Sequence, residues 1–343
     1  MATARREVET EVVVVGAGVM GLATARALAQ AGRDVVVCEQ FAVGHDRGSS
    51  HGASRIVRLS YPDTRWVRLA QESYPLWRGL EAEAGRPLLE LHGTLDLGDW
   101  EPNERALTAC GEPSEVLDAA EIGRRFPIRV ELGASGLFQR DGGIVLADHA
   151  VAALRGGALD AGAVLREETR VDAVEEDGDA VTAGDLRARV AVVTAGAWAP
   201  ALAGVDAAPT RETSSYFTAD EPFPSVLDTT VEAISGYALV APGVGLKAGL
   251  HQTGPVVDPD DPGTPDEAIA AGTAEWIARR FPSVSGPIRT ETCLYTTRTN
   301  DEFVLERRGR IVVGSPCSGH GFKFAPLIGA RLAGLALEAL DGT

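Results

Sequence analysis

The N-terminal part of the chain alternates between apolar runs and glycines in a pattern that predicts a strand, a helix and a second strand. Residues 11–15 (EVVVV) form a short, β-branched run closed by glycine, which is typical of a buried strand. Residues 22–31 (LATARALAQA) repeat apolar side chains at helical spacing, and Gly32 follows at the helix end. Residues 34–38 (DVVVC) form the next apolar run. The pattern therefore predicts a βαβ unit.

Two later segments have the same character and indicate that the chain returns to this first domain. Residues 187–200 (RARVAVVTAGAWAP) predict a buried strand that ends in a glycine turn, and residues 306–340 predict a strand, a glycine turn and a helix. The intervening stretches are richer in proline, glycine and acidic turns. We therefore expect a second domain that interrupts the first one twice. The expected boundaries are 1–85, 141–204 and 289–343 for the first domain, and 86–140 and 205–288 for the second.

Three glycines lie in the turn between the first strand and the helix. In a dinucleotide-binding fingerprint Gly16 permits the tight turn, Gly18 lets the backbone approach a pyrophosphate, and Gly21 lets the helix pack closely. Glu39 follows the second strand, where a carboxylate accepts ribose hydroxyls. An ordinary glycine turn would leave Glu39 unexplained. We therefore expect a dinucleotide cofactor, although this motif does not distinguish FAD from NAD.

Composition narrows the classes of partner. Acidic residues outnumber basic ones 49 to 32, and the resulting formal charge of −17 repels nucleic-acid backbones and anionic lipid surfaces. We expect neither as a partner. No apolar stretch approaches the ~20 residues of a membrane span, and the four cysteines lack CxxC or zinc-like spacing. The expectation is a cytoplasmic protein with reduced thiols and no metal site.

The pattern of residues 44–63 (GHDRGSSHGASRIVRLSYPD) fits neither a helix nor a hydrophobic strand. A loop rich in glycine and serine suits a segment that lies along a cofactor. If the chain is extended here, the odd spacing of Arg55 and Arg58 sends them to opposite sides, so that one could address each face of a flat ring. The alternative is that both are ordinary surface arginines.

The basic residues comprise 30 arginines and only two lysines, Lys247 and Lys323. Both lysines stand in glycine-rich, apolar surroundings (GVGLKAGLH and SGHGFKF) in which a solvated lysine is not expected. A compact ammonium group is suited to binding an anion, or to stabilising oxygen as it becomes superoxide. The alternative is that they are stray surface lysines.

Taken together, the motifs GAGVMG, GSSHGASRIVR, TAGAW, GLKAGLH, TCLYT and SGHGFKF resemble those of the monomeric sarcosine oxidase and N-methyltryptophan oxidase family. This family is part of the D-amino-acid-oxidase-like FAD-dependent oxidoreductases, and the resemblance runs in order from residue 11 to about residue 335. It implies an α/β fold with a Rossmann-like FAD-binding domain and an inserted α+β substrate domain built on an antiparallel sheet.

The resemblance also implies roles for particular residues. Cys293, which the residues alone would make a buried structural cysteine, would carry the flavin through a thioether. Arg58 and Lys323 would bind the substrate carboxylate, and Lys247 would activate oxygen. The other active-site positions implied are Arg55, His51, His251, Tyr295 and Tyr237. The cofactor-binding positions implied are Gly16, Gly18, Gly21, Glu39, Ser49, Arg55, Val171, Gly196, Cys293, Gly319, Gly321 and Lys323.

The activity implied by the resemblance is oxidation of a secondary amino acid such as sarcosine or another N-methyl amino acid. Hydride passes to flavin, the imine hydrolyses, and oxygen is reduced to hydrogen peroxide. The expected partners are the amino acid and oxygen, and the expected state is a monomer.

Three alternatives stay open. The stretch from Trp198 to Lys247 is shorter than in typical members, which would fit a biosynthetic oxidase of a cyclic imino acid resembling pipecolate or proline. A nicotinamide-dependent dehydrogenase would share the first βαβ unit but gives no role to TCLYT. A flavin-binding protein without turnover would not need Arg58, Lys247 and Lys323.

Overall fold

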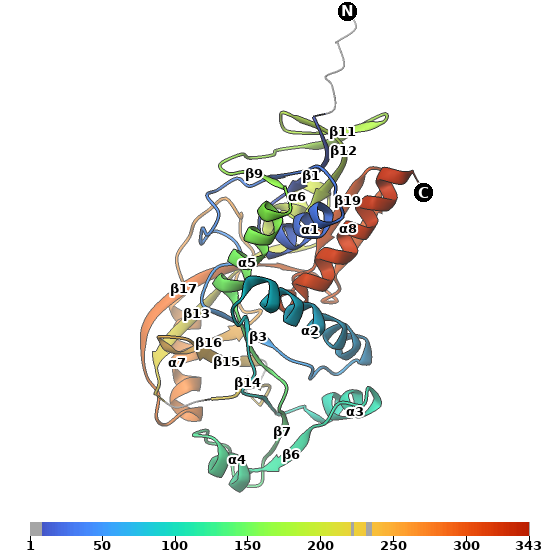
Figure 1. Ribbon diagram of the computed structural model, residues 1–343. Coiled ribbons are helices and arrows are strands. Elements are labelled where there is room, and N and C mark those ends of the chain that lie inside the picture. The colour runs from blue at the N-terminus through green and yellow to red at the C-terminus, as the bar shows by residue number, and fades with distance from the viewer. Residues whose placement is uncertain (1–8, 221–222, 231–234, 343) are drawn as a thin grey trace, which may run out of the picture.

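The computed structural model describes residues 9–220, 223–230 and 235–342. The chain forms two lobes (Figure 1). Helices α1 (Val19–Gln30) and α8 (Ala325–Asp341) lie side by side in one lobe, and helix α7 (Glu267–Arg280) lies with strands of the other. The first eight residues, which the sequence analysis includes in the first domain, lie outside the described residues.

The first sheet has eight strands in the described part of the chain, and its centre is parallel. β1 pairs with β2 and β12, β2 pairs with β9, and β12 pairs with β19, all in parallel. The central strands are valine runs buried on both faces, as expected when helices cover a parallel sheet. The strands are β1 (Thr10–Val15), β2 (Val35–Cys38), β9 (Val164–Arg166), β10 (Val174–Asp177), β11 (Ala180–Ala183), β12 (Leu186–Val193), β18 (Val304–Arg308) and β19 (Ile311–Ser315). The predicted βαβ unit is β1, α1 and β2.

Helices α1, α5 (Ala147–Asp160) and α8 contribute, with α2 (Thr64–Ala84), to the largest hydrophobic core. A glycine allows α8 to approach α1 closely, because a Cβ at Gly329 would lie 2.5 Å from the Cβ of Ala23. This packing holds α1 against β1 and so fixes the glycine turn that joins them.

The second sheet has eight strands in the order β17, β13, β16, β15, β14, β5, β7, β6 within the described residues. Its pairs are antiparallel, as expected for the inserted domain, and only β14 with β5 is parallel among the pairs of the described residues. A second core lies between this sheet and α7. The strands are β5 (Thr94–Leu97), β6 (Glu115–Asp118), β7 (Ser135–Gln139), β13 (Ala208–Thr218), β14 (Ser225–Asp228), β15 (Ser235–Ala241), β16 (Gly245–His251) and β17 (Ser285–Thr297).

Strand β17 runs through the domain boundary that was expected at residue 289. Residues 289–297 pair with β13 in the second sheet, although the sequence analysis assigns them to the first domain. The reason is that one continuous strand of 13 residues spans the boundary. Cys293 therefore stands on an edge strand of the second sheet.

A small third sheet, β3 (Ser54–Val57), β8 (Gly143–Leu146) and β4 (Leu89–Glu90), joins the two lobes. Part of the stretch 44–63, expected to be a loop, is thus a strand, because β3 pairs antiparallel with β8. The remaining helical segments are α3 (Glu101–Ala109), α4 (Ala119–Arg125), α6 (Ala199–Ala203) and the 3₁₀ turns η1 (Gly196–Trp198) and η2 (Phe322–Phe324). Within the described ranges, no helix is both long and apolar enough to cross a bilayer.

Candidate active site

The glycine turn after β1 has the geometry that a dinucleotide fingerprint needs. Gly16 has a φ of +99°, and a Cβ there would lie 2.7 Å from the carbonyl oxygen of Thr194. A Cβ at Gly21 would lie 1.8 Å from the carbonyl oxygen of Gly16, so no larger residue fits. Gly18 is the N-cap of α1. The turn therefore brings backbone N–H groups at the start of a helix to the cavity described below.

Glu39, directly after β2, is a buried carboxylate that the backbone orients. Its Oε2 accepts the N–H of Ala17 (2.7 Å) and its Oε1 accepts the N–H of Phe41 (3.1 Å). Burial raises the pKa of Glu39, but His45 and these two N–H groups together hold it below its usual value. The ionised carboxylate can accept ribose hydroxyls with its remaining lone pairs.

A single cavity of about 1330 Å³ runs from this turn to the boundary between the lobes. That volume exceeds the ~300–1,000 Å³ typical of a site for one drug-sized ligand, and it leaves room for a dinucleotide together with a substrate. Gly21 does not line the cavity, because it packs against Gly16. The other positions expected from the sequence line it together: Gly16, Gly18, Glu39, Ser49, His51, Arg55, Arg58, Val171, Gly196, Tyr237, Lys247, His251, Cys293, Tyr295, Gly319, Gly321 and Lys323.

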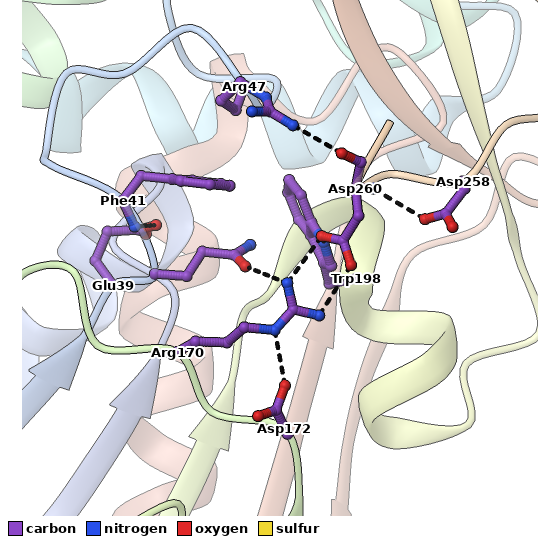
Figure 2. A network of polar contacts seen from close by, with 9 residues as sticks. Glu39, Phe41, Arg47, Arg170, Asp172, Trp198, Asp258 and Asp260 are labelled. Carbon is purple, nitrogen blue, oxygen red and sulfur yellow. Dashed lines mark hydrogen bonds and ion pairs between the residues drawn. The ribbon is translucent and has the colours of Figure 1, made fainter. Parts of the chain in front are cut away.

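Figure 2 shows a polar network at the rim of the cavity near Glu39. Arg170 donates to both carboxylate oxygens of Asp260 (2.9 Å each), and the indole N–H of Trp198 donates to Oδ1 (2.8 Å). Arg47 donates to the carbonyl of Asp260 (2.9 Å). The hydrogen bonds from Arg170 and Trp198 lower the pKa of Asp260 to about 2. These contacts hold the segment between β16 and α7 against Arg170 and Trp198, which line the cavity.

Arg55, on β3, is held by carbonyl groups. Its guanidinium donates to the carbonyl oxygens of Ser49 (2.9 Å), His51 (2.7 Å) and Ser54 (2.8 Å), and it lies 5.7 Å from the ring centre of Phe322. Three fixed acceptors leave the side chain little freedom, so its positive charge has a defined place in the cavity wall.

Arg58 and Lys323 approach each other although they are far apart in the sequence. The guanidinium of Arg58 lies 4.3 Å from the ring centre of Tyr61, and Lys323 Nζ lies 5.6 Å from the same centre. Burial and the charge of Arg58 hold the pKa of Lys323 well below its usual value. Asp96 Oδ1 lies 3.7 Å from Arg58. The pair can bind a carboxylate, with a planar fork and a compact ammonium as donors.

Lys247, on β16, is buried against a carboxylate. Its Nζ donates to Glu291 Oε1 (2.7 Å), and the hydroxyl of Tyr216 donates to the same oxygen (2.6 Å). Burial and Arg55 lower the pKa of Lys247, and Glu291 opposes that change. An ion pair therefore lies beside Cys293.

Cys293 and Tyr295 stand two residues apart on β17 and so share one face of the strand. Cys293 is 8% exposed, and burial raises the pKa of its thiol while Lys247 and Arg55 oppose the rise. The rings of Tyr295 and His251 lie 5.7 Å apart. Burial lowers the pKa of His251 and of His51 to about 4 each, so both imidazoles are neutral near pH 7.

Four polar residues of this region were not predicted from the sequence. Glu291 and Tyr216 contact the Lys247 site directly. Asp96 Oδ2 accepts hydrogen bonds from Asn103 (2.9 Å) and from the hydroxyl of Ser60. Ser50, rather than Ser49, accepts the N–H of Val19 at the start of α1 (3.0 Å). Glu291 had a usable signal, because residues 291, 293 and 295 alternate onto one strand face.

Comparison with known proteins identifies the family to which this cavity belongs. The family model described as FAD dependent oxidoreductase (DAO) matches residues 11–335. The chain belongs to this family. The glycine turn, the ionised Glu39 and the size of the cavity fit FAD as the cofactor.

The relatives extend over nearly the full length of this chain. A probable sarcosine oxidase from Arabidopsis thaliana is 32% identical over 376 residues, covering 97% of this chain and 89% of its own. A monomeric sarcosine oxidase from Streptomyces avermitilis is 32% identical over 364 residues, covering 95% and 93%. The structure of NikD, an unusual amino acid oxidase essential for nikkomycin biosynthesis, superposes with a TM-score of 0.86 at 29% identity, covering 97% and 95%.

Proposed function

We propose that the protein is an FAD-dependent oxidase of N-methyl amino acids, acting on the C–H beside a secondary amine. The observation that carries this proposal is the convergence of Arg58 and Lys323 on Tyr61 in the cavity that also contains the dinucleotide turn. Two cations that lie beside the same ring suit the carboxylate of an amino acid. The sarcosine oxidases among its relatives support the same substrate class.

The residues act mainly by position and charge. When bound, FAD supplies the two-electron acceptor that oxygen reoxidises, with hydrogen peroxide as product. Arg58 and Lys323 bind the carboxylate and thereby orient the rest of the amino acid in the cavity. The amine must react unprotonated, and the positive charges of Arg55 and Arg58 favour its neutral form. His51 and His251, neutral near pH 7, add no further charge.

Lys247 is assigned to the oxygen half-reaction. Its buried ammonium can stabilise negative charge as it develops on oxygen. The residues for the FAD are Gly16, Gly18, Glu39, Ser49, Arg55, Val171, Gly196, Gly319 and Gly321, with Tyr237 and Tyr295 at the substrate.

A peroxide assay across sarcosine, other N-methyl amino acids, proline and pipecolate tests the substrate class. We expect peroxide from the open-chain N-methyl amino acids. Turnover of the cyclic imino acids alone would favour the biosynthetic alternative, which the sarcosine oxidase relatives do not favour. The nicotinamide alternative has no support, because the family uses FAD.

Covalent attachment of FAD through Cys293 is part of the proposal, supported by the place of this thiol in the cavity wall. Acid precipitation of the purified protein should leave the yellow colour in the pellet. Cys293→Ser should release it into the supernatant, whereas Cys317→Ser, a change at another thiol of the cavity wall, should not. Colour in the wild-type supernatant would disprove the attachment. A monomeric state and a cytoplasmic location also stay predictions, which gel filtration and cell fractionation test.

A further inference from the structure

Glu291 stands in the cavity region without a role in the proposed chemistry. It lies on β17 two residues before Cys293, and β13 separates β17 from the strand that carries Lys247. The register pairs Ser214 with Glu291 on one side of β13 and Tyr216 with Lys247 on the other. The sheet therefore brings Glu291 and Lys247 together across an intervening strand.

The contacts of Glu291 centre on one oxygen. Lys247 Nζ and the Tyr216 hydroxyl both donate to Oε1, at 2.7 and 2.6 Å, whereas Oε2 lies 3.6 Å from the guanidinium of Arg289. The side chain of Lys247 is 5% exposed and that of Glu291 is 19% exposed. A charge so deeply buried is costly unless it is paired. The ammonium state of Lys247 thus depends on a nearby anion.

We propose that Glu291 is a positioning residue that keeps Lys247 as an ammonium ion and directs it within the cavity. This inference rests on the proposed function, in which Lys247 serves the oxygen half-reaction. Without Glu291, the buried lysine would lose its proton rather than remain charged and unpaired. The amine would then offer no positive charge to developing superoxide.

The other charged groups near Lys247 and Glu291 shift the pKa of Lys247 in opposite directions. Arg55 disfavours the ammonium of Lys247, while Cys293 would favour it only as a thiolate, which burial opposes. His51 faces Glu291 and Lys247 from the loop before β3, and its low pKa leaves it uncharged. Arg289 lies on the outer side, 57% exposed. In the described part of the chain, Glu291 is the carboxylate that contacts Lys247.

The scarcity of lysine makes a direct measurement feasible. Holoenzyme labelled with ¹³C at lysine Cε should give two lysine signals, because the chain has only two lysines. Lys247→Met assigns them. In Glu291→Gln we expect the titration of Lys247 to move about 1–3 pH units lower. The signal of Lys323 should not move and serves as the internal control, since the charge acting on it is that of Arg58.

Activity provides the second measurement. In Glu291→Gln, the oxygen-dependent rate constant kcat/KM(O₂) should fall, and its decline at high pH should begin at a lower pH, because Lys247 is charged only below its pKa. Flavin reduction by substrate under anaerobic conditions should change little. Glu291→Asp should restore part of both effects, since it keeps a carboxylate one methylene further away.

Matched variants and outcomes separate this role from a structural one. Glu212→Gln removes another buried carboxylate, on β13, whose hydrogen bonds go to Thr210 and to the backbone of residues 253 and 254. This variant should not change the pH at which Lys247 titrates. An unchanged Lys247 titration in Glu291→Gln would overturn the proposal, and Glu291→Asp gives the same test if the amide variant does not fold. Absence of peroxide from N-methyl amino acids, with the titration shifted, would instead refute the proposed function.

Discussion

The two lysines of the chain lie in one cavity but differ in their counter-charge. Lys247 is hydrogen-bonded to Glu291 at 2.7 Å. Lys323, 6% exposed, donates to the carbonyl of His320 at 2.8 Å and has Arg58 as its charged neighbour. The positive charge of Lys247 is thus compensated by the carboxylate of Glu291, whereas Lys323 lies beside another cation.

This difference separates two uses of a buried ammonium group. A lysine paired with a carboxylate can hold its charge before an anion arrives, which suits a group that must stabilise charge developing on a neutral molecule such as oxygen. A lysine beside an arginine lacks an anion until one arrives, which suits recognition of a carboxylate. The predictions below test this division, beginning with the largest expected effect.

Arg58→Met should lower kcat/KM for N-methyl amino acids by about 30- to 1,000-fold. Loss of one partner of a buried charge pair costs roughly 2–4 kcal/mol, and 1.4 kcal/mol corresponds to tenfold. Steady-state kinetics measures it, with KM expected to rise. Arg65→Met, at a half-exposed arginine on α2, is the control and should leave the kinetics unchanged. A similar loss in both variants would contradict the assignment of Arg58.

Lys247→Met should slow reoxidation by oxygen by about 10²–10³-fold, the cost of removing one preorganised electrostatic group. Anaerobic reduction of the flavin should remain close to that of the wild type. Stopped-flow spectrophotometry separates the two half-reactions. Unchanged reactivity with oxygen would remove Lys247 from this role and would erase the distinction between the two lysines.

Binding of a carboxylate should raise the pKa of Lys323 and take up as much as about one proton. Since burial and Arg58 lower this pKa in the free protein, binding should be strongest below the free pKa and should weaken as pH rises above it. Titration calorimetry with propionate in buffers of different ionisation enthalpy measures the uptake. An affinity and a heat independent of pH and buffer would show that Lys323 is already charged.

Asp96→Asn should tighten propionate binding by about two- to fivefold. Asp96 Oδ1 lies 3.7 Å from the guanidinium of Arg58, so its charge weakens the attraction of Arg58 for an incoming anion. The amide can keep the contacts with Asn103 and Ser60. An effect of this size corresponds to about 0.5–1 kcal/mol. Weaker binding would instead mean that Asp96 orients Arg58.

Local sequence was enough to predict the start of the fold. The valine runs, the glycines at 16, 18 and 21 and the acid at 39 belong to one βαβ unit, whose geometry depends on neighbours in the chain. The rarity of lysine also marked Lys247 and Lys323 before any contact was known. The residues that contact these two lysines could not be predicted from the local sequence. The roles of Arg58 and Cys293 were predicted only from the resemblance to a family.

Tertiary structure decided what each functional side chain faces. Glu291 reaches Lys247 across an intervening strand, 44 residues away in the chain, and Asp96 meets Arg58 from the second sheet. β17 continues through the expected domain boundary and carries Cys293 with it. Pairing between distant strands sets these contacts, and no local pattern records strand order or register. The sequence by itself thus determined which unusual groups the protein has, and only the fold decided which of them are compensated, because charge compensation depends on distances between strands.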